Sequence, residues 1–418
     1  MARYALFLVL GAMLSLLTLG TNMIRNATDA YANYILYAAR TNAHSIATSA
    51  ANITANWIFL DTLGNNISYS NISFNGGTFN ASSVDDYSRG RKIITATSEV
   101  KTYLPGYIVK PYTGDTTGFV RDTCIVILQP SGYCKYAYYS VLEGSINWAS
   151  ADTIWGPFHT QDIITYKGSP TFYGKVTTNK GKTGSSGTPN FFGGYQSGIN
   201  VPLNPKSLTI LKQAALDSGR YFRKDSLRLV FKGDSIKWKF GTKPDTTKLI
   251  KDFTRCGVIY LDSNIIYVSG TNHGRITVAS VSSTAYMGKI YIEDDIKYTD
   301  DPRVVIGAKN ITGLVASNEI YISTSIPNDS DVVIQAAMFS LNQGFGADSY
   351  DKKKISGTIY LFGGITQKQR LAVGTLNSGN GKIEHGYAKN YKYDTRLFSD
   401  APPFFPTTGR YEIISWRE

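Results

Sequence analysis

The chain opens with one long uncharged stretch, and this stretch constrains the fold more than any other feature. From Tyr4 to Ile24 no side chain carries a formal charge, with Arg3 before the run and Arg25 after it. This length matches the ~20 residues that a helix needs to cross the ~30 Å hydrocarbon core of a membrane. The sequence therefore predicts a membrane-spanning helix at the N-terminus.

The helical pattern continues beyond that run. Residues 29–60 contain no Gly and no Pro, and their larger apolar side chains recur at the intervals of one helical stripe. A single helix over residues 1–60 would be roughly 90 Å long at ~1.5 Å per residue, too long to be buried in one domain of its own chain. We therefore predict that it packs against other copies of the chain. The predicted assembly positions are Tyr4, Leu8, Gly11, Ala12, Leu16, Gly20, Tyr31, Ile35, Ala43, Ala47, Ala50, Ile53 and Trp57.

Two alternatives bear on this helix. The opening run could be a cleaved signal peptide, but its apolar core exceeds the usual 7–15 residues and no clean A-x-A site precedes Asn26. We therefore predict that the run is retained. For the last turns, packing on the chain's own β-rich part is as good an interpretation as packing on other copies, whereas the first half has no such partner.

Composition indicates strands in the rest of the chain. Charged residues make up only 18% of the 418 residues, while Gly (39) and Tyr (29) are abundant. We predict an α+β, mainly β protein with three parts: an N-terminal assembly or transmembrane helix over 1–60, a small β subdomain over 61–150, and a β-rich domain over 151–418. A short helix is expected near 205–217, because Pro205 suits a first turn and Gly219 a stop.

Short strands dominate residues 151–418. Each run is apolar on alternate residues and is followed within about ten residues by Asn, Asp or Gly, as the stacked rungs of a β-helix or solenoid require. A β-sandwich would also place turns every 8–12 residues. The solenoid-like body is our preferred interpretation.

The net charge of +12 favours contact with anionic surfaces or glycans. The Lys residues are scattered with no long basic run, so a solvated, mildly basic surface is the simpler interpretation and no specific nucleic-acid partner is expected. Within the Asn- and Ser-rich stretch 65–83, the N-x-S/T triplets at Asn66, Asn71 and Asn80 are weak glycosylation signals, because a chain so rich in Asn, Ser and Thr produces such triplets by chance.

Only three cysteines occur. Cys124 and Cys134 flank IVILQPSGY, whose Pro-Ser-Gly predicts a hairpin turn, so a cross-hairpin disulfide fits an oxidising compartment. A second hairpin is predicted over residues 92–112. Cys256 is expected to be a buried small hydrophobe.

No pattern indicates catalysis, a cofactor or a metal. Two acidic groups, Glu293-Asp294-Asp295 and Asp300-Asp301, could bind a hard cation or act as an acid/base pair on polysaccharide, but a solvated turn is the simpler interpretation. The four histidines are far apart, and no phosphate-binding glycine loop is present. We predict a protein that is not an enzyme, with no catalytic residues, no cofactor and no metal site.

The opening run, followed by DAYANYILYAARTNAHSIATSAANITAN, resembles the N-terminal segment of type IV pilin-like proteins, in particular the larger minor-pilin class. The segments GPFHT, FYGKVTT, GLVASNEIYI, QAAMFSLN, YDTRL and PPFFP look like those of β-rich domains that carry such a helix. Unlike typical pilins, the run contains no Glu near its start. The resemblance implies a helix that sits in the inner membrane before assembly and in the core of an extracellular filament afterwards.

These observations lead to two main hypotheses. In the first, the chain is a structural, homo-oligomeric subunit of a type IV pilus-like filament on the cell surface, with the β body outside. In the second, it is a membrane-anchored monomer whose body binds glycan or cell envelope. A third, an anchored polysaccharide-active enzyme, depends on the region of Asp294 and Asp301.

Overall fold

The chain divides into two compact units, each described here by itself. The computed structural model describes residues 2–61, 65–86, 91–104, 116–150, 152–352, 355–376 and 383–418. Unit 1 comprises Met1–Pro130 and Arg410–Glu418, and unit 2 comprises Ser131–Gly409. One long N-terminal helix followed by a β-rich body is therefore confirmed. The predicted boundary at residue 150 is wrong, because the first unit ends at Pro130 and the end of the chain returns to it.

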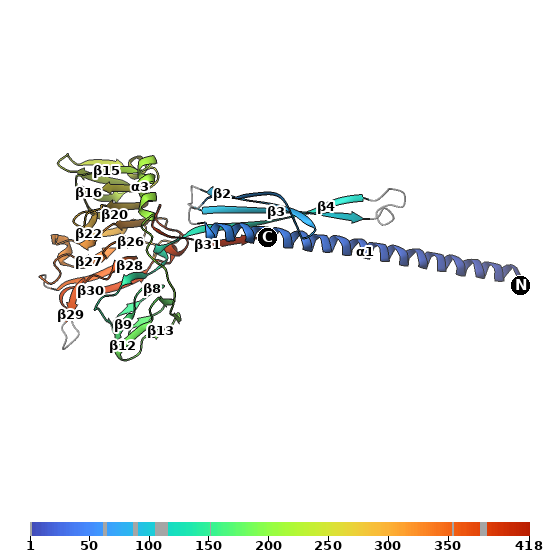
Figure 1. The fold of residues 1–418 in the computed structure, drawn as a ribbon, viewed down its shortest axis with the longest axis horizontal. Helices are drawn as coiled ribbons and strands as arrows, with labels where there is room; N and C mark the ends of the chain where they lie inside the picture. Colours follow the sequence, from blue (N-terminus) through green and yellow to red (C-terminus); the bar gives the residue numbers. More distant parts are fainter. Residues whose placement is uncertain are drawn as a thin grey trace. The chain divides into compact units, whose positions relative to one another are not determined.

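Unit 1 consists of the long helix and one sheet, in which the first four strands pair antiparallel (Figure 1). The sheet order is β1-β2-β3-β4-β31. The bounds of these elements are α1 Ala2–Leu60, β1 Ser68–Phe74, β2 Gly77–Asp86, β3 Arg91–Leu104, β4 Thr116–Gly132 and β31 Thr407–Arg417. Figure 1 shows the second half of α1 lying along this sheet, while its first half runs on beyond the strands.

The second half of α1 and the sheet share one core. One helix face is buried from Ala39 onward, and its members recur every three or four residues: Ala39, Ala43, Ile46, Ala47, Ala50, Ala51, Thr54, Ala55 and Ile58. Alternate residues of β2, β3 and β4 meet this face, among them Ile94, Ala96 and Val126. Ser98 fixes the helix with a 2.6 Å hydrogen bond from its Oγ to the carbonyl oxygen of Ala43.

The close approach of α1 to the sheet explains why alanine is frequent on the buried face of the helix. A Cβ built on Gly77 of β2 would lie 2.8 Å from Cδ1 of Ile46 and 2.7 Å from the carbonyl oxygen of Glu99. Larger helix side chains than alanine would force the two layers apart, since protein interiors are already close-packed. The small residues of this half of α1 therefore serve the chain's own sheet.

Unit 2 contains two long series of parallel strands. In the first, each strand pairs in parallel with the next: β15 Arg220–Arg223, β19 Val258–Asp262, β21 Arg275–Val281, β23 Ile311–Ala316, β26 Ala337–Ser340, β28 Ile355–Gln369, β5 Tyr138–Leu142, β8 Phe158–Thr160, β11 Val176–Thr178 and β14 Tyr195–Gln196.

The second series is also parallel. It comprises β16 Leu227–Gly233, β20 Ile265–Asn272, β22 Lys289–Tyr298, β24 Ile320–Ile322, β25 Val332–Ile334, β27 Phe345–Ala347, part of β28, and β30 Ile383–Tyr393. Antiparallel strands β17 Ser235–Phe240, β18 Thr246–Leu249 and β29 Gly374–Leu376 extend it. The described residues of the unit also form the short helices α3 Ser207–Asp217, α4 Ile250–Phe253, η1 Tyr133–Lys135, η2 Ile326–Asp329 and η3 Thr395–Phe398. The helix predicted near 205–217 is α3.

Register aligns the apolar residues of successive strands. Ile266 of β20 pairs with Ile290 of β22, which in turn pairs with Ile320 of β24, and all three side chains are fully buried. Outward positions of the same strands carry Tyr267 and Tyr291, whose rings stack with centroids 5.7 Å apart. The period-2 alternation read in the sequence thus becomes an apolar stack inside and a polar, aromatic face outside.

Three passes of the chain between residues 148 and 196 repeat one local structure. Two further parallel sheets arise there: β6 Trp148–Ala149, β9 Ile164–Lys167 and β12 Lys182–Ser186 form one, and β7 Thr153–Ile154, β10 Thr171–Phe172 and β13 Asn190–Phe191 form the other. Each pass places an exposed aromatic ring before a glycine. The rings of Trp155 and Tyr173 stack at 4.0 Å, and those of Tyr173 and Phe192 at 5.2 Å.

Replacing Gly174 with alanine is expected to destabilise unit 2 by about 3 kcal/mol, the upper end of the usual cost of overpacking. The added Cβ would lie 2.1 Å from the carbonyl carbon and oxygen of Gly156, which are backbone atoms of the neighbouring pass. Gly274→Ala is the matched control, because a Cβ there meets no atom closer than 3.5 Å. Urea unfolding of the full chain, followed by hydrogen exchange in each unit, measures the difference. Equal stability of the two variants would contradict the close approach at Gly174.

Candidate functional site

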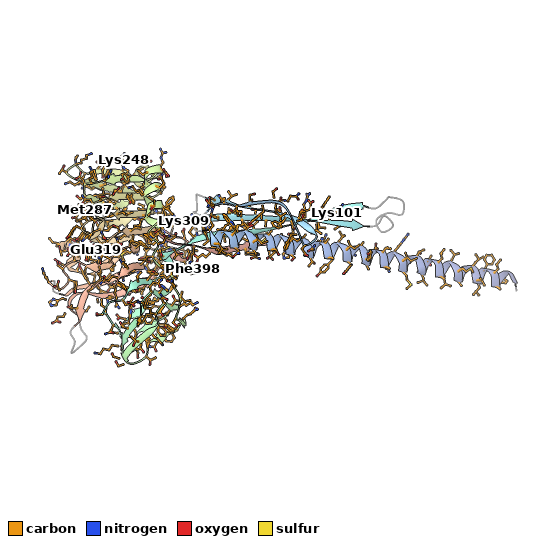
Figure 2. The ribbon with its side chains drawn as sticks, viewed as in Figure 1. Lys101, Lys248, Met287, Lys309, Glu319 and Phe398 are labelled. Carbon is orange, nitrogen blue, oxygen red and sulfur yellow. The ribbon has the colours of Figure 1, made fainter. Side chains whose placement is uncertain are left out.

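The side chains in the first half of α1 are exposed rather than packed against the rest of the chain. No described side chain from Tyr4 to Ala38 is buried, and Tyr4, Leu8 and Leu16 are 82%, 75% and 69% exposed. Figure 2 shows the side chains of this half of α1 projecting from the helix beyond the end of the sheet of unit 1. The helix is long and apolar enough to cross a membrane, judged by length and composition. The predicted positions in this half, Tyr4, Leu8, Gly11, Ala12, Leu16, Gly20, Tyr31 and Ile35, are exposed or half-buried.

Exposed aromatic residues continue past the length of a membrane span. Tyr34 and Tyr37 are 67% and 70% exposed and lie ten and thirteen residues beyond Ile24. At ~1.5 Å per residue they stand roughly 15–20 Å outside the apolar run. Arg25 and Asp29 are the formal charges between the run and these tyrosines. A long, nearly uncharged helical surface thus extends from the apolar run to the start of the packed half.

Three predicted assembly positions do not belong to this surface. Ala43, Ala47 and Ala50 are buried against the chain's own sheet, so they cannot contact another copy. The prediction that they pack between copies is wrong, because their spacing matches the face that unit 1 uses internally. Ile53, 41% exposed, lies outside that face, and Trp57 is half-buried beside the core.

The predicted disulfide is also wrong. Cys124 and Cys134 are free, and the Pro-Ser-Gly segment between them belongs to the continuous strand β4 rather than to a turn. From Cys124 to the end of β4 the extended chain covers about 26 Å at ~3.3 Å per residue, whereas a disulfide needs Cα atoms within ~7 Å. Of the hairpin predicted over 92–112, the first part forms β3, and residues 105–112 lie outside the described residues.

The acidic residues of β22 and its neighbourhood are paired. Glu293 accepts a 2.8 Å hydrogen bond from Arg228, and the two carboxylate oxygens of Asp295 accept from the Val333 amide at 2.7 Å and from Lys297 at 2.8 Å. A hydrogen bond from Arg303 lowers the pKa of Asp301 to about 2. In the part of the chain that the structure describes, no group of three or more His, Cys, Asp or Glu is placed to hold a metal ion.

A cavity of about 40 Å³ lies inside unit 2 where β5, β28 and β30 meet. Its polar and aromatic lining includes Tyr138, Trp148, Asp152, Arg370, Lys389 and Tyr391. Much of the interior of unit 2 is filled by a cluster of buried apolar side chains, and this cavity lies at a place where polar groups meet it.

Glu143 and Arg370 form a buried ion pair beside this cavity. They are 1% and 7% exposed, and Nη1 of Arg370 lies 3.5 Å from Oε2 of Glu143. The Trp148 indole donates a 2.9 Å hydrogen bond to the same oxygen, and the guanidinium carbon of Arg370 stands 4.0 Å from the centre of the Trp148 ring. The pair is thus held by a charge-assisted hydrogen bond and a cation–π contact away from bulk water.

Lys389 occupies an inward position of β30. It pairs in register with Ile359, and Tyr391 pairs with Leu361; both β28 partners are buried in the core. The Lys389 side chain is exposed at the mouth of the cavity; nearby protein, which removes part of its hydration, and the charge of Arg370 lower its pKa to about 8. Burial likewise raises the pKa of Tyr138.

Sequence reasoning did not single out Glu143, Arg370 or Lys389. One signal was available in the sequence around Lys389, which falls in the same alternating phase as Tyr387, Tyr391 and Tyr393. A charged residue in the buried phase of a strand is a candidate for function. For Glu143 and Arg370, 227 residues apart, no local pattern indicates that they meet.

Comparison of the chain with models of known families, with curated proteins and with solved structures finds no match.

Proposed function

We propose that this protein is a structural subunit of an extracellular type IV pilus-like filament, which polymerises through its N-terminal helix in the filament core with the β body outside. The observation that carries the proposal is the division of α1: the half before Ala39 is bare and apolar, and the half after it is packed on the chain's own sheet. An exposed apolar surface of this size is unfavourable in water unless another molecule covers it.

The bare half of α1 meets a different environment at each stage of assembly. In the inner membrane, lipid tails cover Tyr4–Ile24; in the filament, helices of other copies do. Lipid is as apolar as leucine, so close packing rather than the hydrophobic effect must favour assembly. Gly11 and Gly20 support such packing, because a Cβ at either position would meet nothing within 4 Å and their surface is therefore open to a neighbour.

The alternative function is a membrane-anchored monomer that binds glycan or cell envelope. It uses the same apolar run as an anchor, but it does not account for the exposed helix surface that follows the membrane span. An anchor requires about 20 apolar residues. Tyr31, Tyr34 and Tyr37 lie outside that span and are at least half exposed. Their exposure favours a helix that is covered by other copies along its length.

We also propose that unit 1 is pilin-like and that unit 2 is a β-helix-like solenoid. The first rests on the resemblance of the helical segment and on a helix packed by its second half on a largely antiparallel sheet. The second rests on the parallel pairing of successive strands and on the repeated passes, in which Gly156, Gly174 and Gly193 bring neighbouring backbones close together. A solenoid stacks such repeats with each one contacting its neighbours.

Tyr34→Asp is expected to abolish filaments while leaving the protein in the membrane. In a filament the new carboxylate would be buried without a partner between packed helices, a placement that costs several kcal/mol. Because position 34 lies outside the membrane span, the substitution does not disturb insertion into the membrane. Tyr286→Asp is the matched control, because Tyr286 is 85% exposed on unit 2. Electron microscopy of sheared surface material and membrane fractionation measure the two effects.

Filaments containing the wild-type chain and the Tyr286→Asp variant, but not the Tyr34→Asp variant, are the expected result. If the wild-type chain is expressed in the membrane and no filament contains it, the filament proposal fails and the anchored monomer takes its place. If Tyr34→Asp assembles as well as the control, the surface beyond the membrane span is not an assembly surface.

A further inference from the structure

One end of unit 2 carries more than half of the net charge of the chain. Residues 220–255, which form β15 to β18 and α4, contain eleven Lys and Arg and four Asp, and so contribute +7 of the net +12. We call these residues the basic end. Figure 1 shows β15 and β16 at one end of unit 2, and Figure 2 places Lys248 at the same end. The cations form no run in the sequence, because on β16 and β17 they alternate with inward apolar residues such as Leu229 and Ile236.

Most of this charge is not neutralised within the chain. Two of the four aspartates already have partners, since Asp234 contacts His273 and Asp245 pairs with Lys237. Positive charges gathered at one end repel one another, and an anionic partner relieves that repulsion. Six lysines of the basic end are exposed and make no ion pair with any residue that the structure describes: Lys224, Lys232, Lys239, Lys243, Lys248 and Lys251.

A row of outward side chains runs from the basic end across five strands. In register, Lys239 of β17 pairs with Arg228 of β16, Arg228 with Tyr267 of β20, Tyr267 with Tyr291 of β22, and Tyr291 with Tyr321 of β24. At ~4.8 Å between strands the row is about 19 Å long. The tyrosine rings stack on one another with centroids 5.7 and 5.9 Å apart, and the Arg228 guanidinium stands 5.4 Å from the centre of the Tyr267 ring.

We propose that the basic end binds an acidic polysaccharide, whose anionic groups meet the exposed lysines and whose chain lies along this row. Glu293 already accepts a 2.8 Å hydrogen bond from Arg228, so Lys239 and Lys232, which lies on the same face of β16 as Arg228, supply the uncompensated charge. Stacking covers the ring faces between neighbouring tyrosines and leaves their edges and hydroxyls for a partner. A tyrosine hydroxyl both donates and accepts a hydrogen bond, as the hydroxyls of a sugar do.

The same surface is less suited to other polyanions. Single-stranded nucleic acid stacks its bases on exposed aromatic faces, and a membrane holds a protein through several exposed apolar side chains. Leu249 is the one large apolar side chain exposed over residues 220–255, all of which the structure describes. The major groove of duplex DNA admits a helix, but α4 has four residues. Charges beside a row of hydroxyls therefore favour an acidic polysaccharide.

Binding of the full chain, held in nanodiscs of zwitterionic lipid, to immobilised probes tests the proposal. The probes are polygalacturonate, dextran sulfate, uncharged dextran, a DNA duplex and phosphatidylglycerol vesicles. At least one acidic polysaccharide is expected to bind, with an affinity that falls as salt is added, and dextran is not. Binding of neither acidic polysaccharide would overturn the proposal, as would tighter binding of the duplex or the vesicles at an equal concentration of charge.

The double variant Lys232→Gln, Lys239→Gln is expected to weaken binding of the acidic polysaccharide roughly tenfold, the effect of losing two exposed ion pairs. The matched control is Lys175→Gln, Lys392→Gln, which removes two exposed charges from the part of unit 2 that carries β11 and β30. Hydrogen exchange of unit 2 checks that both proteins are folded. Equal affinity of the two double variants would overturn the assignment of the basic end.

Tyr291→Phe removes one hydroxyl and keeps the ring in its stack. It is expected to weaken binding of the acidic polysaccharide about threefold, as the loss of one hydrogen bond does, whereas Tyr286→Phe, at an 85% exposed position, leaves the affinity unchanged. The same affinity for both would overturn the path of the polysaccharide along the row. Because the basic end lies in unit 2 and not in α1, none of these outcomes depends on filament formation, and this test and the filament test fail independently.

Discussion

Replacing Glu143 with alanine is expected to lower the free energy of unfolding of unit 2 by about 3–5 kcal/mol, the usual cost of removing one partner of a buried ion pair. The Arg370 guanidinium, 7% exposed, would lose its charged partner, and the Trp148 indole would lose the acceptor of its 2.9 Å hydrogen bond. Urea unfolding of the full chain, followed by hydrogen exchange in unit 2, measures the loss.

Glu384→Ala is the control for that substitution. Glu384 lies on β30 of the same unit and is exposed, so its removal is expected to change stability by less than about 0.5 kcal/mol. Glu143→Gln keeps the shape and an acceptor but removes the charge, and is expected to fall between the two. If Glu143→Ala is as mild as Glu384→Ala, the pair is not desolvated as its burial indicates.

Ile46→Ala is expected to destabilise unit 1 by about 2–5 kcal/mol, through lost burial and the cavity left behind. Ile46 is fully buried between α1 and the sheet, in contact range of the position where Gly77 has no side chain. The same chemical change at Ile53, which is 41% exposed on another face of the helix, is expected to cost well under 1 kcal/mol. The two variants therefore differ in burial alone.

Comparing Ile46→Ala with Ile53→Ala also tests whether the second half of α1 holds the sheet independently of the first half. Ile46→Ala is expected to loosen the sheet from α1, seen as faster hydrogen exchange in β2 and β3, while the bare half of the helix keeps its surface. Exchange in those strands that is equally slow in both variants would contradict the packing of α1 on the sheet.

The sequence predicted the helices and strands well because each is determined by residues that lie close together in the chain. An uncharged run without Pro predicted the start of α1, and residues 29–60 without Gly or Pro predicted its continuation to Leu60. Alternating apolar residues predicted the strands, and Pro205 with Gly219 placed the short helix α3. In each case the signal and the hydrogen bonds it governs lie within a few residues.

Partners across the chain were not predictable in the same way. The pattern of Ala43, Ala47 and Ala50 shows that one helix face packs closely, but a periodicity carries no information about what covers the face. By its sequence the Pro-Ser-Gly segment could form a turn or continue a strand. In the structure it is part of the continuous strand β4. The return of residues 410–418 to unit 1 depends on pairing between β4 and β31, strands separated by all of unit 2.

The sequence by itself thus determined a long N-terminal helix with a bare apolar start and a β-rich body, because helix and strand periodicities are set by neighbouring residues. Only the tertiary structure decided which half of that helix is free and which is covered, since that depends on a sheet built from later strands. It also decided that Glu143, Arg370 and Lys389 line or flank one cavity, because parallel pairing brings strands from distant parts of the chain side by side.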